Sequence, residues 1–318
     1  RQFARTIKCP ERMNLSDDYK ETMRLIVSIR ALSQSGFRTP TIIDFKPIRS
    51  ISPAAALLLA AELDRWNQVN RQRKLRAIDV HLWDPNVRLL LKQMGFFELL
   101  GVDRNFIKCD MSDSSMSATR FLPFYAGEGA IGGVAEKLRK VIEDFVGTLD
   151  SRYAIYDGLV EGMTNVQHHA YPDGGGLKRW WISASIDSIN GKLTVLCLDH
   201  GVGIPKTLPR KNGEALRSYV QIVGDVLKDD AKMIQAAVEL RRTSTGKRHR
   251  GHGLTRDIRR VVESHMKGGR LRIFSNKGMY SYRKNPDGSE SVSLNRLPVS
   301  LDGTFIEWVI EDNQAVGK

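Results

Sequence analysis

Apolar positions along the first third of the chain follow helical and strand-like patterns in turn. Their spacing and residue types predict five elements: a helix over about 19–32, a strand over 41–45, a helix over 53–69, a strand over 75–82 and a helix over 86–102. The second helix is strongly apolar and begins through Ser52 and Pro53, a typical helix start. Strands and helices in this order predict an α/β domain in which the crossovers cover a sheet.

A polar, serine-rich stretch at residues 108–118 is the best linker in the sequence. The pattern beyond it predicts a second set of elements: a helix over 134–145, a helix after Asp150, two strands joined by an Asn190-Gly191 hairpin, a long basic helical section over about 214–242, a helix from about 254, and antiparallel strands near the C-terminus. The second region is therefore also α/β, with antiparallel strands.

The composition is that of an ordinary globular protein, with 41% hydrophobic and 27% charged residues. No apolar run approaches the ~20 residues that a membrane span requires, and the N-terminus shows no signal-peptide pattern. Cys9, Cys109 and Cys197 lack the spacing of a metal or redox motif, and they suit a reducing cytosol. We therefore expect a cytoplasmic protein without a membrane partner.

The net charge of +13 is concentrated in part of the chain. Between Lys206 and Arg272 there are 17 Lys and Arg against 7 Asp and Glu, and the densest cluster is "RRTSTGKRHRGHGL" (residues 241–254). Basic residues crowded against glycines suit bound phosphates, whether these belong to a nucleotide or to a nucleic acid. Charge alone therefore leaves both classes of ligand open.

The stretch "EGMTNVQHHAYPDGGG", which begins at Glu161, places polar groups on one face of a predicted helix. Glu161, Asn165 and His169 recur at intervals of four, so their side chains share that face. The opposite side carries an apolar stripe of Ile155, Leu159, Met163, Val166 and Ala170. In isolation, an E-x-x-x-N pattern is explained by a solvated helix face. Whether these residues form a functional site therefore depends on motifs elsewhere in the chain.

Two glycine-containing segments farther along the chain suit a bound nucleotide. A predicted strand ends at Asp199, and a carboxylate there can accept a hydrogen bond from a flat heterocycle that lies on exposed backbone. Gly201 and Gly203 remove side chains that would block this approach. Gly251 and Gly253 immediately precede a helix, whose free N–H groups and positive dipole end bind phosphate.

The order of these segments resembles the Bergerat-fold ATP-binding domain shared by histidine kinases, type II topoisomerase and mismatch-repair ATPases, and anti-sigma serine kinases. The N box of that family is similar to residues 161–165, the G1 box to residues 199–203 and the G2 box to residues 251–254. "HHAY" is close to the form in anti-sigma kinases. The resemblance covers roughly residues 130–312 and implies a sandwich in which a mixed, mainly antiparallel sheet carries helices on one face.

This resemblance implies that the domain binds ATP and Mg²⁺. Asn165 would bind the Mg²⁺ that bridges the phosphates, and Glu161 would be catalytic by polarising the nucleophile near the γ-phosphate. Asp199 would accept the adenine amino group, supported by Thr304, whereas His169 either joins the site or only caps or packs against the lid. The other implied nucleotide-binding residues come from the glycine boxes and from the lid, the basic section between them: Gly201, Gly203, Lys247, Arg248, Arg250, Gly251, His252, Gly253 and Leu254.

The N-terminal part, roughly residues 20–108, resembles a STAS domain, the fold of anti-sigma factor antagonists and transporter tails. The phosphorylated serine of that family lies in a D-S-S-G-like turn, whereas this chain has Ile51-Ser52-Pro53-Ala54. Ser52 keeps a hydroxyl and is a candidate both for a phosphosite and for a helix N-cap. The two resemblances predict three regions: a STAS-like regulatory domain over residues 1–108, a linker over 109–129 and a Bergerat-fold ATP-binding domain over 130–318.

Three functions fit this organisation. The first is an ATP-dependent switch that hydrolyses ATP slowly and changes a partner surface. The second is an anti-sigma-type serine/threonine protein kinase with its STAS-like regulator in the same chain. An ordinary histidine kinase is disfavoured, because Glu161 stands where histidine kinases commonly carry an amide and favours water or a hydroxyl as nucleophile. The third, a nucleic-acid-binding module whose nucleotide site has decayed, ranks last because the ligand positions retain competent residues. We expect a protein partner through the STAS-like domain, and the sequence leaves a homo-oligomer open.

Overall fold

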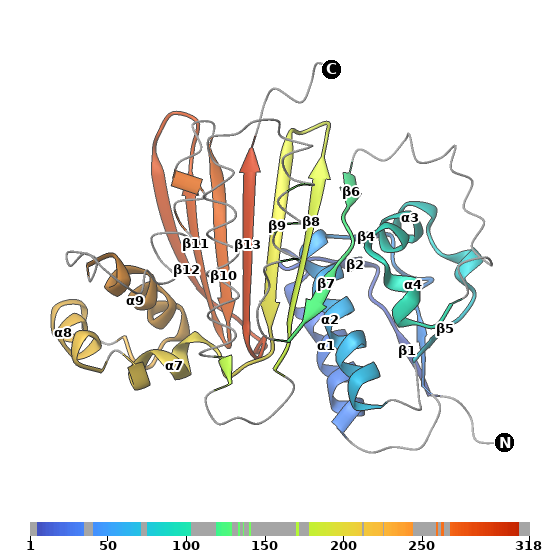
Figure 1. The fold of residues 1–318 in the computed structure, drawn as a ribbon, viewed down its shortest axis with the longest axis horizontal. Coiled ribbons are helices and arrows are strands. Elements are labelled where there is room, and N and C mark those ends of the chain that lie inside the picture. Colours follow the sequence, from blue (N-terminus) through green and yellow to red (C-terminus); the bar gives the residue numbers. More distant parts are fainter. Residues whose placement is uncertain are drawn as a thin grey trace. The chain divides into compact units, whose positions relative to one another are not determined.

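The structure is a computed structural model of the chain (Figure 1). It describes these residues, to which all structural statements below refer: 5–34, 41–70, 75–102, 119–128, 133, 136, 140, 170–171, 178–211, 213–224, 226–243, 259, 262–263 and 268–311. The chain divides into two compact units. The N-terminal unit comprises residues 1–124 and 183–189, and the C-terminal unit comprises residues 125–182 and 190–318.

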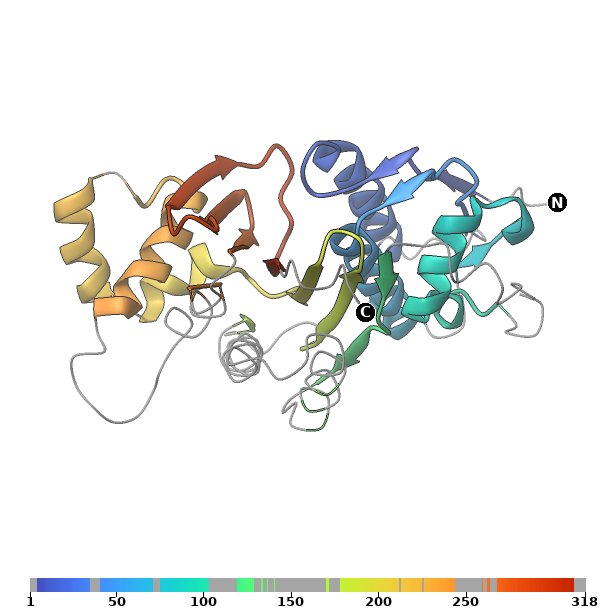
Figure 2. The ribbon, with the colours of Figure 1, turned by 90° about the horizontal axis from the view of Figure 1, so that it is seen from above.

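The N-terminal unit is built on a small parallel sheet with the strand order β1-β3-β5, and a further parallel pair joins β2 to β4. Parallel neighbours require crossover connections, and α1 and α2, which pack against each other, lie in these connections (Figure 1 and Figure 2). The bounds are β1 Arg5–Lys8, β2 Arg12–Met13, α1 Tyr19–Gln34, β3 Thr41–Asp44, β4 Ser50–Ile51, α2 Pro53–Val69, β5 Arg76–Ala77, η1 Val80–Leu82, α3 Pro85–Met94 and α4 Phe96–Leu99.

Helix α2 confirms the predicted helix start. Ser52 has an extended backbone, and its Oγ accepts a hydrogen bond from the Ala55 N–H at 3.2 Å, while Pro53 opens the helix. This contact is the N-cap interaction of a Ser before a Pro. Because almost every position over residues 54–64 is buried, the apolar character of the helix on all sides is explained by its place in the core.

Two predicted elements of the N-terminal unit are shorter than the sequence suggested. The strand predicted over 75–82 is limited to β5, because Asp79 adopts a left-handed φ of 51° and the chain continues as the short helix η1. The helix predicted over 86–102 breaks at Gly95, whose φ is 87°. The Gly95 N–H binds the carbonyls of Leu91 and Lys92, which is how a glycine ends a helix.

An eight-stranded sheet has the strand order β12-β11-β10-β13-β9-β8-β6, with β7 also paired to β8. Neighbouring strands pair antiparallel wherever their register is described, which confirms the predicted α/β class with an antiparallel sheet. Strands β6 and β7 lie within the range predicted as a linker. The bounds are β6 Thr119–Phe121, β7 Tyr125–Gly127, β8 Trp180–Asp187, β9 Lys192–Asp199, β10 Gly269–Ser275, β11 Gly278–Lys284, β12 Glu290–Arg296 and β13 Thr304–Glu311.

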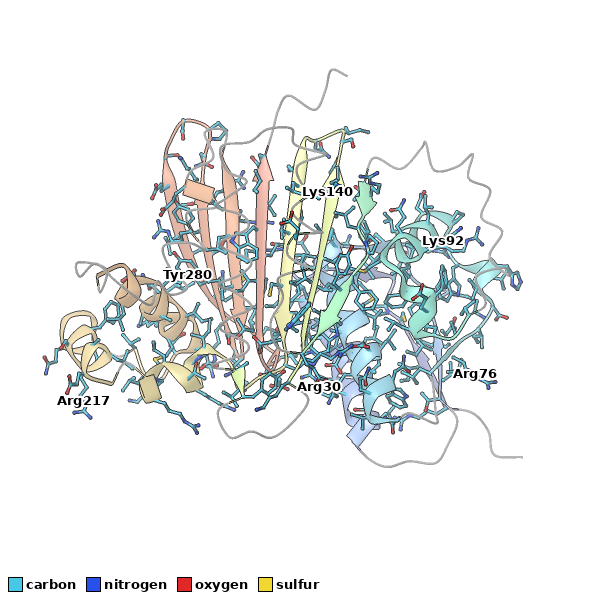
Figure 3. The ribbon with its side chains drawn as sticks, viewed as in Figure 1. Arg30, Arg76, Lys92, Lys140, Arg217 and Tyr280 are labelled. Atoms are coloured by element: carbon cyan, nitrogen blue, oxygen red, sulfur yellow. The ribbon has the colours of Figure 1, made fainter. Side chains whose placement is uncertain are left out.

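The basic section between β9 and β10, predicted to be helical over about 214–242, contains three helices among the described residues up to 243. It forms α7 (Ile204–Lys211), α8 (Gly213–Val223) and α9 (Asp230–Thr243). These helices enclose a core of their own, made of Leu208, Leu216, Val226, Met233, Ala236 and Ala237. Helix α9 packs on β11, whereas Arg217 on α8 points away from its neighbours (Figure 3). The part of the predicted lid up to residue 243 is therefore a packed helical subdomain.

Candidate functional site

The candidate site lies where three neighbouring strands of the C-terminal unit end or begin. Asp199 is the last residue of β9, and its register partner is Thr304, the first residue of β13. Thr304 is in turn the partner of Ser275, the last residue of β10. Antiparallel pairing thus brings three polar side chains into one row at one end of the sheet, although they are far apart in the sequence.

Asp199 is only 6% exposed, and neutral hydrogen-bond donors surround its carboxylate. The Gly201 N–H donates to Asp199 Oδ1 at 2.7 Å, and Thr304 donates both its backbone N–H and its hydroxyl. Burial raises the pKa of Asp199 to about 7, even though these three donors lower it. Desolvation therefore outweighs the hydrogen bonds, so the described protein groups compensate the charge of the ionised carboxylate only in part.

Gly201 allows the loop after Asp199 to pack tightly. A Cβ at Gly201 would lie 2.3 Å from the Ala170 carbonyl oxygen and 2.4 Å from its Cβ. The neighbouring Val202 N–H donates to that same carbonyl at 2.8 Å. The sequence analysis assigns this glycine to the close approach of a ligand. The structure shows instead that it allows contact with Ala170, the residue after His169.

Gly203 has an equally specific reason to lack a side chain. Its φ is 86°, and a Cβ would lie within 2.8 Å of Ser275 Oγ and of both side-chain polar atoms of Asn276. Gly303, with a φ of 120°, is similar, since a Cβ there would meet the Asp199 carbonyl oxygen at 2.1 Å. The glycines on both sides of the site therefore let backbone segments approach each other closely.

Ser275 and Asn276 belong to this site and were missed by the sequence reasoning. Ser275 Oγ accepts from the Ile204 N–H at 2.9 Å and donates to the Gly303 carbonyl at 2.8 Å, so it joins the two glycine loops. Asn276, at a left-handed φ of 52°, donates from Nδ2 to the Val202 carbonyl at 3.1 Å. The only local signal was the "SNKG" turn, in which Asn tolerates this conformation.

The same β10–β11 turn also holds the helical subdomain. The Lys277 N–H donates to Asp230 Oδ2 at 2.8 Å, and Asp230 is the first residue of α9. A Cβ at Gly278 would lie 2.4 Å from the Ala231 nitrogen, so the turn and the helix start are in direct contact. One short turn therefore touches both the Asp199 loop and α9.

Two further side chains near Asp199, those of Cys197 and His200, are packed against the protein itself. Cys197 faces the same side of β9 and is buried, and burial followed by the charge of Asp199 raises the pKa of its thiol far above the ordinary range. Such a thiol is not a nucleophile. The His200 ring lies 4.7 Å from the Trp181 ring, centroid to centroid. Among the described residues, the group at this site that can accept a hydrogen bond from a ligand is therefore the Asp199 carboxylate.

The remaining predicted site residues lie outside the described residues, and their roles stay predictions: Glu161, Asn165, His169, Lys247, Arg248, Arg250, Gly251, His252, Gly253 and Leu254. Within the described ranges, no group of three or more His, Cys, Asp and Glu side chains could hold a metal ion. Nor is any described helix both long and apolar enough to cross a membrane.

Comparison with known proteins adds little to this geometry. No protein-family model and no curated protein matches the chain. Among solved structures, it is similar to the SiaB–SiaC complex from Pseudomonas aeruginosa at 17% identity, over 66% of this chain and 98% of that chain, with a TM-score of 0.29. It is also similar to the B-subunit of the DNA gyrase from Myxococcus xanthus at 13% identity, over 59% of this chain and 45% of that chain, with a TM-score of 0.24. At TM-scores this low, neither likeness carries an argument about this protein.

Proposed function

We propose that the C-terminal unit binds ATP at the row formed by Asp199, Thr304 and Ser275, with the adenine amino group donating to the Asp199 carboxylate. One observation carries this proposal. Asp199 is a buried carboxylate at a strand end, between two loops that need glycine, and its hydrogen-bond donors among the described residues are all neutral. Groups with strongly shifted pKa values in such places are candidates for functional sites.

The hydrogen-bonding capacity of Asp199 fits a single additional donor. An ionised carboxylate offers about four acceptor positions. Three are used by the Gly201 N–H and by the N–H and hydroxyl of Thr304. The remaining position suits one N–H of an exocyclic amino group. A ligand N–H there would add a charge-assisted hydrogen bond and favour the ionised form.

The rest of the proposed mechanism rests on the resemblance. Asn165 would hold an Mg²⁺ ion, which would supply positive charge to the phosphates, Glu161 would polarise a water molecule, and Lys247, Arg248 and Arg250 would neutralise the phosphates. Slow hydrolysis of the bond to the γ-phosphate of bound ATP would return the protein to its nucleotide-free conformation. The β10–β11 turn touches both the Asp199 loop and α9, so it offers a physical connection from nucleotide to α7–α9. A STAS-like N-terminal unit would carry the signal to a protein partner.

Calorimetric titration of the full chain with ATP and Mg²⁺ tests the adenine contact. Asp199→Asn replaces a carboxylate with an amide that can turn a donor toward the ligand, so affinity should fall by roughly 5- to 150-fold, or about 1–3 kcal/mol. Asp302→Asn is the matched control, because Asp302 is exposed, lies close in sequence to Thr304, and has a left-handed φ of 56° that Asn tolerates. Equal ATP affinity in Asp199→Asn and in the unsubstituted chain would reject the proposal.

The fate of the γ-phosphate separates the switch from the kinase. The chain is incubated with γ-labelled ATP, Mg²⁺ and proteins that co-purify with it. Label released as free phosphate supports the switch, whereas label on a co-purified protein supports a serine/threonine kinase. Glu161→Ala should leave ATP bound and reduce either reaction by about 10²–10⁴-fold, since general-base assistance typically supplies that much.

A further inference from the structure

Strand β12 forms one end of the eight-stranded sheet and is highly exposed. Among the described residues, β12 pairs only with β11, in an uninterrupted register from Gly278–Arg296 to Lys284–Glu290. Six of its seven residues are exposed, and Val292 is 47% exposed. The strand contains no Pro and no bulge, which are common protections of sheet edges. Its outer edge is therefore suited to pairing with another strand.

Backbone hydrogen bonds show which β12 residues face outward. The Leu297 N–H donates to the Lys277 carbonyl, and the Asn285 N–H donates to the Ser289 carbonyl. In an antiparallel pair, both backbone groups of a residue point to the same side and successive residues alternate. The odd-numbered residues of β12 therefore bond to β11. The even-numbered residues direct their N–H and C=O groups to the outer edge: Glu290, Val292, Leu294 and Arg296.

The sequence of β12 is complementary to itself when it is read in the opposite direction. If Ser293 lies opposite Ser293 of a second copy, Glu290 faces Arg296 and Val292 faces Leu294, and each of these pairs occurs twice. Ser291 then faces Asn295, which joins two polar side chains. Opposite charges, apolar pairs and polar pairs directly across an antiparallel ladder are all stabilising.

Backbone direction and side-chain pairing select the same register. The pairs Glu290–Arg296 and Val292–Leu294 consist of outward-facing residues, so each can exchange two backbone hydrogen bonds across the edge. Shifting one strand by a single residue would pair outward-facing with inward-facing residues and lose these bonds. A shift by two residues keeps the backbone bonds but separates Glu290 from Arg296. The centred register therefore satisfies both requirements.

We propose that β12 is a homodimerisation edge, at which two copies of this chain join their sheets antiparallel about a two-fold axis that passes by Ser293. A two-fold interface uses the same patch on both copies, which requires self-complementarity of the kind that β12 shows. The inference is independent of nucleotide binding. In the single chain Glu290 forms an ion pair with Arg259 at 3.5 Å, and its side chain is still about half exposed.

Sedimentation analysis of the full chain over a range of concentrations tests the interface. The unsubstituted chain should form a dimer. Arg296→Glu places Glu opposite Glu290 of the second copy at both ends, so the dissociation constant should rise roughly tenfold or more. Arg296→Lys is the matched control and should change it by less than about threefold. A monomeric unsubstituted chain, or equal dissociation constants for both variants, would overturn the proposal.

Cross-linking tests the register separately from affinity. In the proposed pairing, residue 293 faces its own copy as a pair without mutual hydrogen bonds, with the Cα atoms about 4.5 Å apart, which a disulfide can bridge. Ser293→Cys should therefore form a covalent dimer under mild oxidation. Ser291→Cys should not, because four strand residues separate the two copies of position 291 by about 13 Å. The unsubstituted chain controls for its own cysteines, and equal cross-linking at 291 and 293 would refute the register.

Discussion

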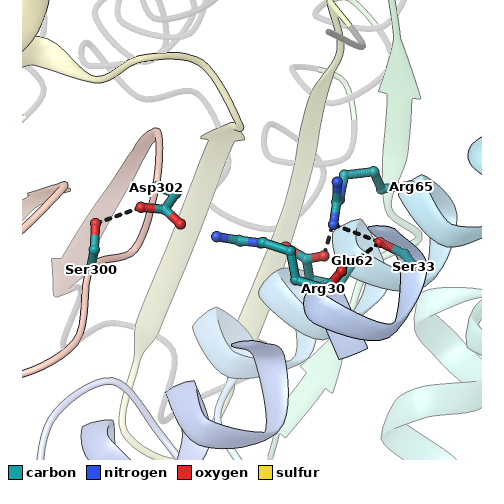
Figure 4. Close-up of polar contacts among 6 residues, drawn as sticks. All are labelled: Arg30, Ser33, Glu62, Arg65, Ser300 and Asp302. Carbon is teal, nitrogen blue, oxygen red and sulfur yellow. Dashed lines mark hydrogen bonds and ion pairs between the residues drawn. The ribbon is translucent and has the colours of Figure 1, made fainter. Parts of the chain in front are cut away.

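Glu62 in the N-terminal unit and Asp199 in the C-terminal unit are both buried carboxylates, yet their surroundings are opposite. The Glu62 side chain is 0% exposed and lies between two guanidinium groups, with Arg30 Nε at 2.8 Å and Arg65 Nε at 3.1 Å (Figure 4). Arg65 also donates to Ser33 Oγ at 3.0 Å. Asp199 instead has three neutral donors and a raised pKa.

The contrast separates a structural carboxylate from a candidate ligand-binding one. Burying a charge is costly unless paired groups compensate for it. Glu62 is compensated within its own unit by two cations on α1 and α2, so it ties these helices together. Asp199 lacks such a cation among the contacts that shift its pKa, and the resulting cost can be relieved when a ligand donor binds.

The largest expected effect on stability comes from removing Glu62, the structural carboxylate of the N-terminal unit. Glu62→Ala leaves Arg30 and Arg65 close together and largely buried without their partner. The free energy of unfolding should fall by about 3–5 kcal/mol, as for other broken buried ion pairs. Chemical denaturation measures this change. Glu21→Ala, which removes the exposed ion pair with Arg24, should cost less than about 1 kcal/mol, and a similar loss in both variants would contradict the comparison.

Gly201→Ala should disturb the loop that brings the Gly201 N–H to Asp199. The added Cβ would lie 2.3 Å from backbone at Ala170, so the loop has to shift. Overpacking of this kind costs about 1–3 kcal/mol of unfolding free energy. Gly213→Ala at the start of α8 is the control, because nothing lies within 4 Å of its Cβ position. Thermal unfolding of the two variants side by side measures the difference.

The raised pKa of Asp199 predicts how stability depends on pH. Between the ordinary Asp pKa of 3.8 and about 7, the folded chain binds more protons at this site than the unfolded chain. Stability from this group therefore falls as pH rises through that window, by about 2–3 kcal/mol between pH 5 and pH 8. Urea denaturation of the unsubstituted chain and of Asp199→Asn at several pH values isolates this contribution. Parallel pH profiles would mean that Asp199 does not titrate there.

Thr304→Val gives the smallest and most local change. It removes the hydroxyl donor to Asp199 and keeps the backbone N–H and the approximate shape of the side chain. The pKa of Asp199 should rise further, and the free energy of unfolding at pH 8 should fall by about 1 kcal/mol. At pH 5, where the Asp199 carboxyl is protonated, the loss should be smaller. An equal loss at both pH values would show that the hydroxyl does not act through the carboxylate.

Local patterns in the sequence predicted much of what depends on neighbouring residues. The cap at Ser52, the helix over 53–69 and the hairpin at Asn190-Gly191 follow from turn chemistry and hydrophobic spacing, and the structure confirms them. The resemblance also links Asp199 with Thr304, and the register of β9 and β13 makes these two residues direct neighbours. The break at Gly95 carried a local signal as well, since glycine commonly ends a helix.

Contacts between distant segments required the tertiary structure. Ser275 and Asn276 belong to the site only because β10 lies beside β13 and its turn reaches the loop after Asp199. The core of α7–α9 likewise depends on packing between the helices rather than on hydrophobic periodicity.

Local sequence specifies many of the elements, the cap at Ser52 and the residue types at the candidate site, because these depend on short-range sterics and periodicity. The contacts that each of these residues makes follow from the tertiary fold. It placed Gly201 against Ala170, gave Glu62 two cations, and left Asp199 with neutral donors. The physical reason is that burial and electrostatic compensation arise between segments far apart in the chain, so no local pattern specifies them.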